Sequence, residues 1–179
     1  MKFTETSLEG AFVIEQEPNT DDRGFFARVW CQNELKAQGL NPNLAQSSIA
    51  LSKKKWTLRG MHYQLPPHEE AKLVLCTKGA VYDAIIDLRP GSLTYKKWFG
   101  VEITEKNRKM IYIPEGFAHG YQTLEDNTEI LYFISQFYNP KSYTGIRWND
   151  PVFGVQWPNM NESKIIISEK DKNFPDFKR

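Results

Sequence analysis

The sequence predicts an all-β domain of the sandwich, jelly-roll or barrel type. Three observations favour this class. Short runs rich in valine, isoleucine and aromatic residues recur along the chain. Turn signals separate these runs, for example Lys78-Gly79, Pro90-Gly91 and Asp126-Asn127. Only one internal segment has the pattern of a helix. Many short strands with few helices are typical of closed or layered β architectures.

The first part of the chain supplies two expected strands and the helix. Residues 11–16 (AFVIEQ) and 24–30 (GFFARVW) are rich in β-branched and aromatic residues, which favour strands. Residues 33–40 (NELKAQGL) form the helix candidate. We expect Asn33 to cap its start and Gly39 to end it.

The remaining expected elements are strands. Residues 57–64 (TLRGMHYQ) have the pattern of an apolar strand, although a histidine lies within it. Further runs of strand-forming residues lie at 72–77 (KLVLCT), 81–89 (VYDAIIDLR), 97–103 (KWFGVEI), 109–114 (KMIYIP) and 129–138 (EILYFISQFY).

The alternation of side chains along residues 129–138 predicts two different faces. One face mixes tyrosines and a glutamine with aliphatic residues, as the inside of a ligand-binding barrel does: Ile130, Tyr132, Ile134, Gln136 and Tyr138. The other face is expected to be core: Leu131, Phe133, Ser135 and Phe137.

Charged residues also lie on otherwise apolar strand faces. Lys72 shares a face with Val74, and Asp83 and Asp87 share a face with Ile85. A buried charge needs a partner or a task, because removing it from water is costly. These positions are therefore candidates for functional residues.

Length and composition fit one soluble domain spanning residues 1–179. The formal net charge of +1 gives no reason to expect a nucleic-acid or membrane partner. The two cysteines, Cys31 and Cys76, form neither a disulfide framework nor a zinc pattern. No apolar run approaches the length of a membrane span or a signal sequence, so we expect a reduced, cytoplasmic protein.

A metal site is one interpretation of the histidines. The segment IPEGFAHG contains P-x-G-x-x-H, which resembles the second motif of the cupin superfamily, with His119 as its histidine. The first cupin motif needs His-x-His, but here the chain has His62-Tyr63-Gln64. Two histidines without an assured third ligand make a poor site, and Glu69 or Glu70 lie in an expected loop. We therefore predict no metal.

Proton transfer is the second interpretation. A histidine titrates near neutral pH, a tyrosine donates a proton, and a lysine stabilises a developing oxyanion. His62, Lys72 and Tyr132 all belong to expected strands and suit proton abstraction next to a carbonyl followed by reprotonation from the other face. The product would be an epimer, and no cofactor is required.

Two arginines suggest anion binding. Arg23 and Arg59 each precede a glycine at the edge of an expected strand. A guanidinium group matches phosphate oxygens bidentately, although isolated arginines more often form surface salt bridges. Neither a P-loop nor a G-x-G-x-x-G motif is present in the sequence.

The motifs taken together resemble the dTDP-4-dehydrorhamnose 3,5-epimerase family over roughly residues 10 to 175. LRGMHYQ and PEGFAHG are the most specific of them, and the further matches are DDRGFF, AKLV, VYDAIIDLRPGSLTYKKW, LYFISQFYNP, GIRWNDP, QWP and SEKD. The resemblance implies a cupin-type jelly-roll barrel with a few short peripheral helices, a homodimer and no cofactor. It also implies 3,5-epimerisation of a nucleotide-linked 4-keto-6-deoxyhexose.

The resemblance also implies roles for single residues. His62 corresponds to the base that removes the C3 and C5 protons, and Tyr132 to the acid on the opposite face of the ring. Lys72 corresponds to the group that holds the C4 oxygen, and Asp171 to the carboxylate that orients the histidine. The implied substrate-binding residues are Arg23, Phe26, Arg28, Gln46, Arg59, His119, Tyr138 and Lys170.

Three positions depart from the family pattern. Arg28 occupies the position of a glutamate, Ser48 that of an asparagine, and Tyr143 that of an acidic residue. Thymine N3 carries a hydrogen and favours an acceptor, whereas cytosine N3 is an acceptor and favours a donor such as arginine. A CDP-linked substrate therefore competes with dTDP, which the family resemblance favours; the alternative is that Arg28 only pairs with surface acids or with a phosphate.

The sequence is also compatible with three further activities. Epimerisation at C3 or C5 alone uses the same groups as epimerisation at both carbons. A metal-dependent cupin enzyme needs a third ligand, and a non-catalytic sugar-nucleotide binder needs no acid or base.

Overall fold

A computed structural model describes residues 1–177 of the chain, and two six-stranded sheets form its body. The first sheet contains β1 (Lys2–Glu5), β2 (Phe12–Glu15), β5 (Gln46–Ser52), β7 (Lys72–Lys78), β10 (Lys109–Ile113) and β12 (Thr128–Ile134). The second contains β6 (Thr57–Gln64), β8 (Ala80–Asp87), β9 (Trp98–Thr104), β11 (Phe117–Thr123), β13 (Tyr143–Gly145) and β14 (Ile166–Ile167). The all-β prediction is confirmed.

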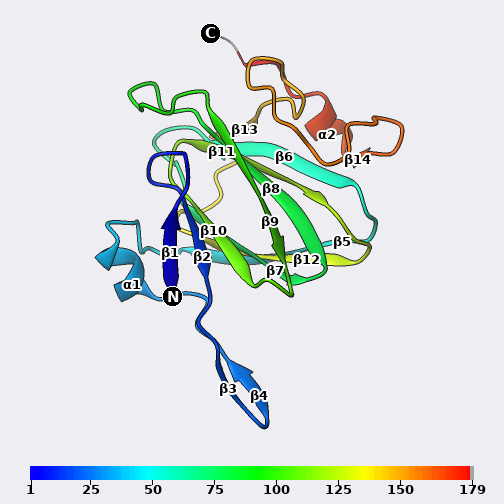
Figure 1. Ribbon diagram of the computed structural model, residues 1–179. Helices are drawn as coiled ribbons and strands as arrows, with labels where there is room; N and C mark the ends of the chain where they lie inside the picture. Colours follow the sequence, from blue (N-terminus) through cyan, green and yellow to red (C-terminus); the bar gives the residue numbers. More distant parts are fainter. Residues whose placement is uncertain (178–179) are drawn as a thin grey trace.

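The order of strands shows that neighbours in space are distant in sequence. The first sheet has the order β1-β2-β10-β7-β12-β5, and the second has β13-β6-β11-β8-β9 with β14 beside β6. All pairs are antiparallel except β14 with β6. Figure 1 shows the two sheets stacked on one another.

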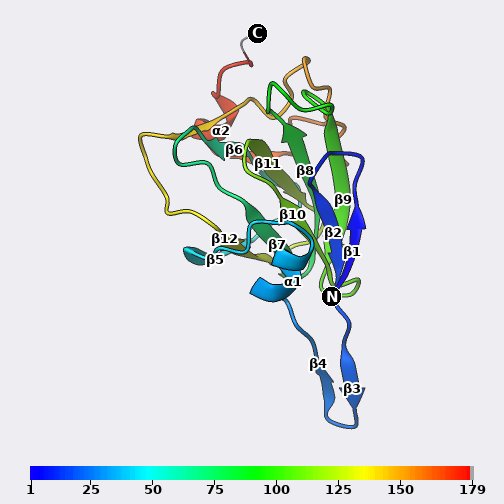
Figure 2. The same ribbon diagram turned by 90° about the vertical axis from the view of Figure 1, so that its left-hand side faces the viewer.

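Three small elements lie outside this body: α1 (Gln32–Ala37), α2 (Glu169–Lys172), and a hairpin of β3 (Asn19–Asp21) and β4 (Gly24–Phe26). The hairpin projects away from the sheets, and α2 lies at the opposite end of the molecule (Figures 1 and 2). No helix in residues 1–177 is long and apolar enough to cross a membrane.

Several predicted boundaries are wrong. The strand expected at 24–30 ends at Phe26, because it pairs only with β3 in the projecting hairpin. The strand expected at 129–138 ends at Ile134, whose partner Lys72 is the first residue of β7. Strands β5 and β11 were not among the expected runs; both are rich in serine, threonine, glutamine or histidine.

The helix prediction is correct in place but wrong in its cap. Cys31 is the N-cap of α1, and Asn33 lies inside the helix. Gly39 ends the helix as expected: its φ is +72°, which glycine adopts without strain, and the Leu40 N–H donates to the Leu35 carbonyl.

The core between the sheets follows the predicted strand period. Val74, Val81, Ile85 and Ile130 belong to one buried cluster, with Tyr132 packed against it. The other face of residues 129–138 is only partly core: Leu131 and Phe133 are partly buried against the α1 side, and Phe137 is 66% exposed. That part of the face prediction is wrong, because residue 137 lies beyond the strand.

Asp87 has a structural role. Arg89 donates to both of its carboxylate oxygens, and Ser92 and Thr94 donate to one of them. Burial raises the pKa of Asp87, but these hydrogen bonds outweigh burial and leave the pKa at about 2. The carboxylate therefore organises the loop after β8.

Candidate active site

A cavity of about 360 Å³ opens between the two sheets. Seven predicted site residues line it, namely Gln46, Arg59, His62, Lys72, His119, Tyr132 and Tyr138, together with Ser48, Ala50, Glu70, Tyr121, Ile134 and Tyr143. The resemblance assigned these seven residues to one site, and they meet in one cavity.

The functional groups come from opposite walls. His62 on β6 lies directly across from His119 on β11 in the second sheet. Tyr132 on β12 and Lys72 on β7 belong to the first sheet, where Ile134 is the cross-strand partner of Lys72. Since the sheets face each other, a ligand between them would meet the imidazole on one side and the phenol on the other.

Two glycines allow the strand that carries His62 to approach its neighbour. A Cβ atom on Gly60 would lie 2.5 Å from the Gly120 Cα, and a Cβ on Gly120 would lie 2.8 Å from the Arg59 carbonyl oxygen. Gly60 also has a φ of +122°, which other residues rarely adopt. The glycine close to each histidine in the sequence is thus explained by close packing of β6 on β11.

Asp171 holds the imidazole of His62 in place. The Asp171 Oδ1 lies 2.8 Å from His62 Nε2, and the Gly60 N–H donates to Asp171 Oδ2 over 3.2 Å. Asp171 lies on α2, where the Ser168 hydroxyl caps the helix by accepting from the Asp171 N–H. The predicted orienting carboxylate therefore reaches the histidine from the C-terminal end of the chain.

The environment sets the protonation of this pair. Burial raises the pKa of Asp171, but the hydrogen bonds from His62 and Gly60 outweigh burial, so its pKa stays below the ordinary value. An ionised carboxylate only accepts hydrogen bonds, so Nε2 of His62 carries the hydrogen and Nδ1 is free to take a proton. Burial lowers the pKa of His62 more than Asp171 raises it, and the charge of Lys72 lowers it further.

Tyr132 is held in its protonated form. Burial raises the pKa of its phenol well above the ordinary value, and the neighbouring Tyr121 and Asp83 raise it further. The ring of Tyr132 meets that of His119 edge to face, with centroids 6.2 Å apart. A phenol of this kind gives up its proton only to a strong base, for example a carbanionic carbon.

Two more ion pairs are buried around the cavity. Lys72 Nζ lies 2.8 Å from the Glu70 carboxylate, and His119 Nε2 lies 2.8 Å from the Asp83 carboxylate. Asp83 is fully buried and its second oxygen has no partner among the described residues, and burial raises its pKa. Two of the three charges predicted on strand faces, Lys72 and Asp83, therefore have partners in or beside the cavity.

The mouth of the cavity carries a further cation. The guanidinium group of Arg59 donates to the Ser52 hydroxyl and to the Leu51 carbonyl, both over 3.3 Å. The side-chain oxygen of Gln46 accepts from the Tyr138 N–H. Arg59 therefore keeps guanidinium N–H donors free, as binding of a phosphate group requires. Two tyrosines, Tyr138 and Tyr143, line the same cavity.

Four predicted substrate residues lie outside the cavity lining. On the hairpin, Arg23 pairs with Asp21, and Phe26 is 78% exposed. Arg28 pairs with Glu34 of α1 at 2.8 Å, which is the simple salt bridge that the sequence already suggested. Lys170 Nζ lies 4.0 Å from the ring centroid of Tyr143, a residue that does line the cavity.

Sequence reasoning missed the contributions of Glu70 and Tyr121, whereas Tyr138 was predicted and Tyr143 was identified as a departure from the family pattern. Tyr143 contacts both His62 and Tyr138, with ring centroids 5.4 Å apart in each pair. Glu70 lies two residues before Lys72, so the strand period could have indicated a shared face. Nothing in the sequence indicated that the loop before β7 brings Glu70 inward.

Gln64, which stands where the first cupin motif has a second histidine, is bound to backbone groups. Its amide nitrogen donates to the carbonyls of His68 and Phe137, and its oxygen accepts from the Asn139 N–H. The side chain is therefore used in holding loops together. Within residues 1–177, no group of three or more His, Cys, Asp or Glu side chains is arranged to hold a metal ion.

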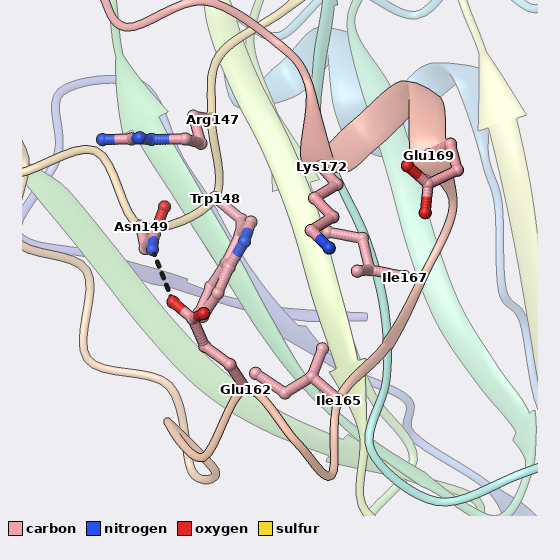
Figure 3. A pocket seen from close by; sticks show the side chains of 8 residues that line it. All are labelled: Arg147, Trp148, Asn149, Glu162, Ile165, Ile167, Glu169 and Lys172. Carbon is pink, nitrogen blue, oxygen red and sulfur yellow. Dashed lines mark hydrogen bonds between the residues drawn. The ribbon is translucent and has the colours of Figure 1, made fainter.

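A second cavity of about 380 Å³ lies beside α2 (Figure 3). Its walls are formed by Arg147, Trp148, Asn149, Glu162, Ile165, Ile167, Glu169 and Lys172. Glu169 and Lys172 extend from α2 over this cavity. Its lining includes no histidine, tyrosine or cysteine, and none of the predicted catalytic residues.

Comparison with known proteins decides the family. The family model of dTDP-4-dehydrorhamnose 3,5-epimerase matches residues 5–179. The chain belongs to the dTDP-4-dehydrorhamnose 3,5-epimerase family. It is therefore a carbohydrate epimerase, that is, an isomerase, and the predicted cupin-type fold is confirmed by the structures of this family.

Members of this epimerase family match over nearly their whole length. The dTDP-4-dehydrorhamnose 3,5-epimerase of Methanothermobacter thermautotrophicus is 39% identical, covering 97% of this chain and 92% of its own. The crystal structure of the Elizabethkingia anophelis enzyme has a TM-score of 0.94 at 36% identity, covering 99% and 96% of the two chains. A 3'-monoepimerase from Streptomyces bikiniensis, in complex with dTDP-quinovose, has a TM-score of 0.86 at 28% identity, covering 96% and 85%.

The environment of His62 gives a testable titration. We expect His62 to titrate below pH 6.5 in NMR spectra, and the Asp171→Asn variant to titrate lower still, because the carboxylate is the group that raises this pKa. With the neutral imidazole as the predicted base, activity should fall as pH falls through this pKa. Glu169→Gln on the same helix is the control and should leave the titration unchanged. A higher pKa in Asp171→Asn would contradict the assignment.

Proposed function

We propose that the protein inverts C3 and C5 of a dTDP-linked 4-keto-6-deoxyhexose, of the kind that yields dTDP-4-dehydro-L-rhamnose for deoxysugar and polysaccharide biosynthesis. The observation that carries the proposal is the convergence of the His62–Asp171 pair, Tyr132 and Lys72 on one cavity from opposite walls. The family to which the chain belongs consists of epimerases of this class.

The first step is proton abstraction. Nδ1 of neutral His62 takes the proton from C3 or C5, and the C–H electron pair becomes a C=C bond to C4. The C4 oxygen then carries the negative charge of an enolate. Asp171 stabilises the imidazolium that forms, because its carboxylate accepts the Nε2–H.

The enolate needs a positive group at the C4 oxygen, and Lys72 provides it. C3 and C5 both flank the C4 ketone, so one oxyanion donor acidifies both C–H bonds. A well-placed donor of this kind contributes roughly 3–4 kcal/mol to the transition state. The ammonium of Lys72 is largely shielded from water, which strengthens its effect.

Inversion follows when Tyr132 protonates the same carbon from the other face. The C=C electron pair forms the new C–H bond, the phenol becomes phenolate, and the C4 ketone returns. The imidazolium of His62 loses its proton to solvent and the phenolate regains one, so the site resets. These steps require no redox or metal-bound intermediate.

The nucleotide end of the substrate fits the mouth of the cavity. Arg59 carries free guanidinium donors for the diphosphate, and Tyr138 and Tyr143 offer ring faces for the base or sugar. In support, the Bacillus anthracis relative was solved with TDP and PPi bound; it has a TM-score of 0.93 and 34% identity, covering 98% of this chain and 99% of its own.

A homodimer would account for the hairpin. Arg23 and Phe26 match substrate-binding positions, yet both lie on a projecting hairpin and outside the cavity of their own chain. The β5 edge exposes Ile49 and Leu51 at 64% and 49%. We propose that two copies associate, so that the hairpin of one protomer reaches the cavity of its partner and the exposed apolar side chains are covered.

Deuterium exchange tests the proposed reaction. In D₂O, His62→Asn should slow wash-in at C3 and C5 by roughly 10²–10⁴-fold, because no base remains. Tyr132→Phe should still exchange on the side of His62 but form little inverted product. Tyr95→Phe, outside the cavity, is the control. Exchange at C3 alone would identify a mono-epimerase, and no exchange in the wild type with any sugar nucleotide would leave a non-catalytic binder.

Nucleotide titration tests the base. We expect calorimetry to show dTDP binding roughly tenfold more tightly than CDP, because Arg28 is already paired with Glu34 and a mismatched base edge leaves a polar group unpaired. The Arg28→Ala variant should keep this order. Tighter CDP binding that Arg28→Ala abolishes would instead assign Arg28 to the recognition of cytosine.

Mixing of variants tests the shared site. Arg23→Ala should raise the KM of the substrate, and sedimentation should give the mass of a dimer. Mixing impaired Arg23→Ala with inactive His62→Asn should restore activity, because a mixed dimer has one cavity with both groups intact. Mixing His62→Asn with Tyr132→Phe should restore none, since both residues serve the cavity of the same protomer. A monomer, or no restoration in the first mixture, would reject the arrangement.

A further inference from the structure

The ion pair between Glu70 and Lys72 is the feature of the cavity that the proposed reaction leaves unexplained. The Glu70 Oε1 lies 2.8 Å from the Lys72 Nζ, and the two side chains are only 10% and 11% exposed. Both residues line the cavity beside His62 and Tyr132. A carboxylate is an unexpected neighbour for a site that stabilises a negatively charged enolate, because like charges repel.

The position of Glu70 along the chain shows how the pair forms. Lys72 is the first residue of β7, so its backbone is held by the sheet, and Glu70 precedes it in the connecting segment. The Ala71 N–H donates to the Ser135 hydroxyl, and the Ser135 N–H donates to the Ala71 carbonyl. These two bonds fix the residue between Glu70 and Lys72, so both side chains point to the same side.

A lysine side chain needs such a restraint to act on one oxygen atom. Its four-carbon stem is flexible, and its ammonium group is a point charge without a fixed direction. An ion pair with one carboxylate fixes the nitrogen and uses one of its three N–H bonds, which leaves two for a ligand. Placement within a fraction of an ångström matters, because small misplacements of catalytic groups are costly in rate.

We infer that Glu70 is a positioning residue: its carboxylate holds the Lys72 ammonium where it donates to the C4 oxygen as the enolate forms. This inference rests on the proposed epimerisation. Glu70 itself transfers no proton, so its effect should pass entirely through Lys72. Because Lys72 acts in the transition state rather than in binding, the inference predicts a loss of kcat with little change in KM.

Substitutions at residue 70 test this directly. Glu70→Ala should lower kcat roughly tenfold or more while KM stays within about threefold. Glu70→Gln should retain part of the activity, because its amide oxygen still accepts from Lys72. Glu69→Gln removes a neighbouring acid that does not line the cavity and is the matched control. Thermal unfolding of each variant shows whether the fold is kept.

A double-mutant cycle separates positioning from other roles. In a Lys72→Met background, with exchange followed over long incubations at high enzyme concentration, Glu70→Ala should cost nothing further. The inference would be overturned if Glu70→Ala lowered the rate equally in the wild-type and Lys72→Met backgrounds. It would also be overturned if Glu70→Ala raised KM instead of lowering kcat, or if Glu70→Gln had a higher kcat than the wild type. Normal turnover by the Glu70 variants would reject it while the proposed function stands; no exchange by the wild-type protein would reject the proposed function itself.

Discussion

The carboxylate of Asp171 is the constraint on which the active cavity depends. It is 5% exposed, and a buried carboxylate is tolerated only when its oxygens are hydrogen-bonded. One oxygen meets His62 and the other meets the Gly60 N–H, so the carboxylate binds both the side chain and the backbone of β6. The same two bonds dock α2 onto the second sheet, and α2 in turn places Lys170 against the ring of Tyr143.

The charges around the cavity explain how a site rich in carboxylates can favour an anion. Lys72 Nζ lies 2.8 Å from the carboxylate of Glu70, so these two opposite charges largely cancel. Arg59 has no carboxylate partner within residues 1–177 and lies at the mouth. The unpaired positive charge of Arg59 therefore lies where we propose that a diphosphate enters, and the interior holds paired groups whose directions are fixed.

The local pattern of the sequence predicted the class of fold and the inner faces of several strands. In a pleated strand the side chains alternate between the two faces, and this alternation can be predicted without knowing which strand lies beside it. It placed Lys72, Asp83 and Tyr132 correctly. It failed where the cause is distant: Asp171 is 109 residues from His62 in the chain, and only the family resemblance indicated it. The end of β12 at Ile134 depends on where β7 begins, and the inward direction of Glu70 depends on the hydrogen bond between Ala71 and Ser135. Both are contacts between distant segments, which local propensity does not predict.

Of the three departures from the family pattern, Arg28 lies outside the cavity, whereas Ser48 is the cross-strand partner of Tyr132 and Tyr143 contacts the ring of His62. Arg28 is paired on the outside of α1, and Ser48 lies on β5 at the cavity wall. Tyr143 has a larger effect. An acidic side chain at this position would neutralise the charge of Lys170. The tyrosine ring instead stabilises the ammonium of Lys170 through a cation–π contact, which leaves the positive charge in place. This exchange leaves the positive charge on Lys170 and places an aromatic ring in the cavity wall beside His62.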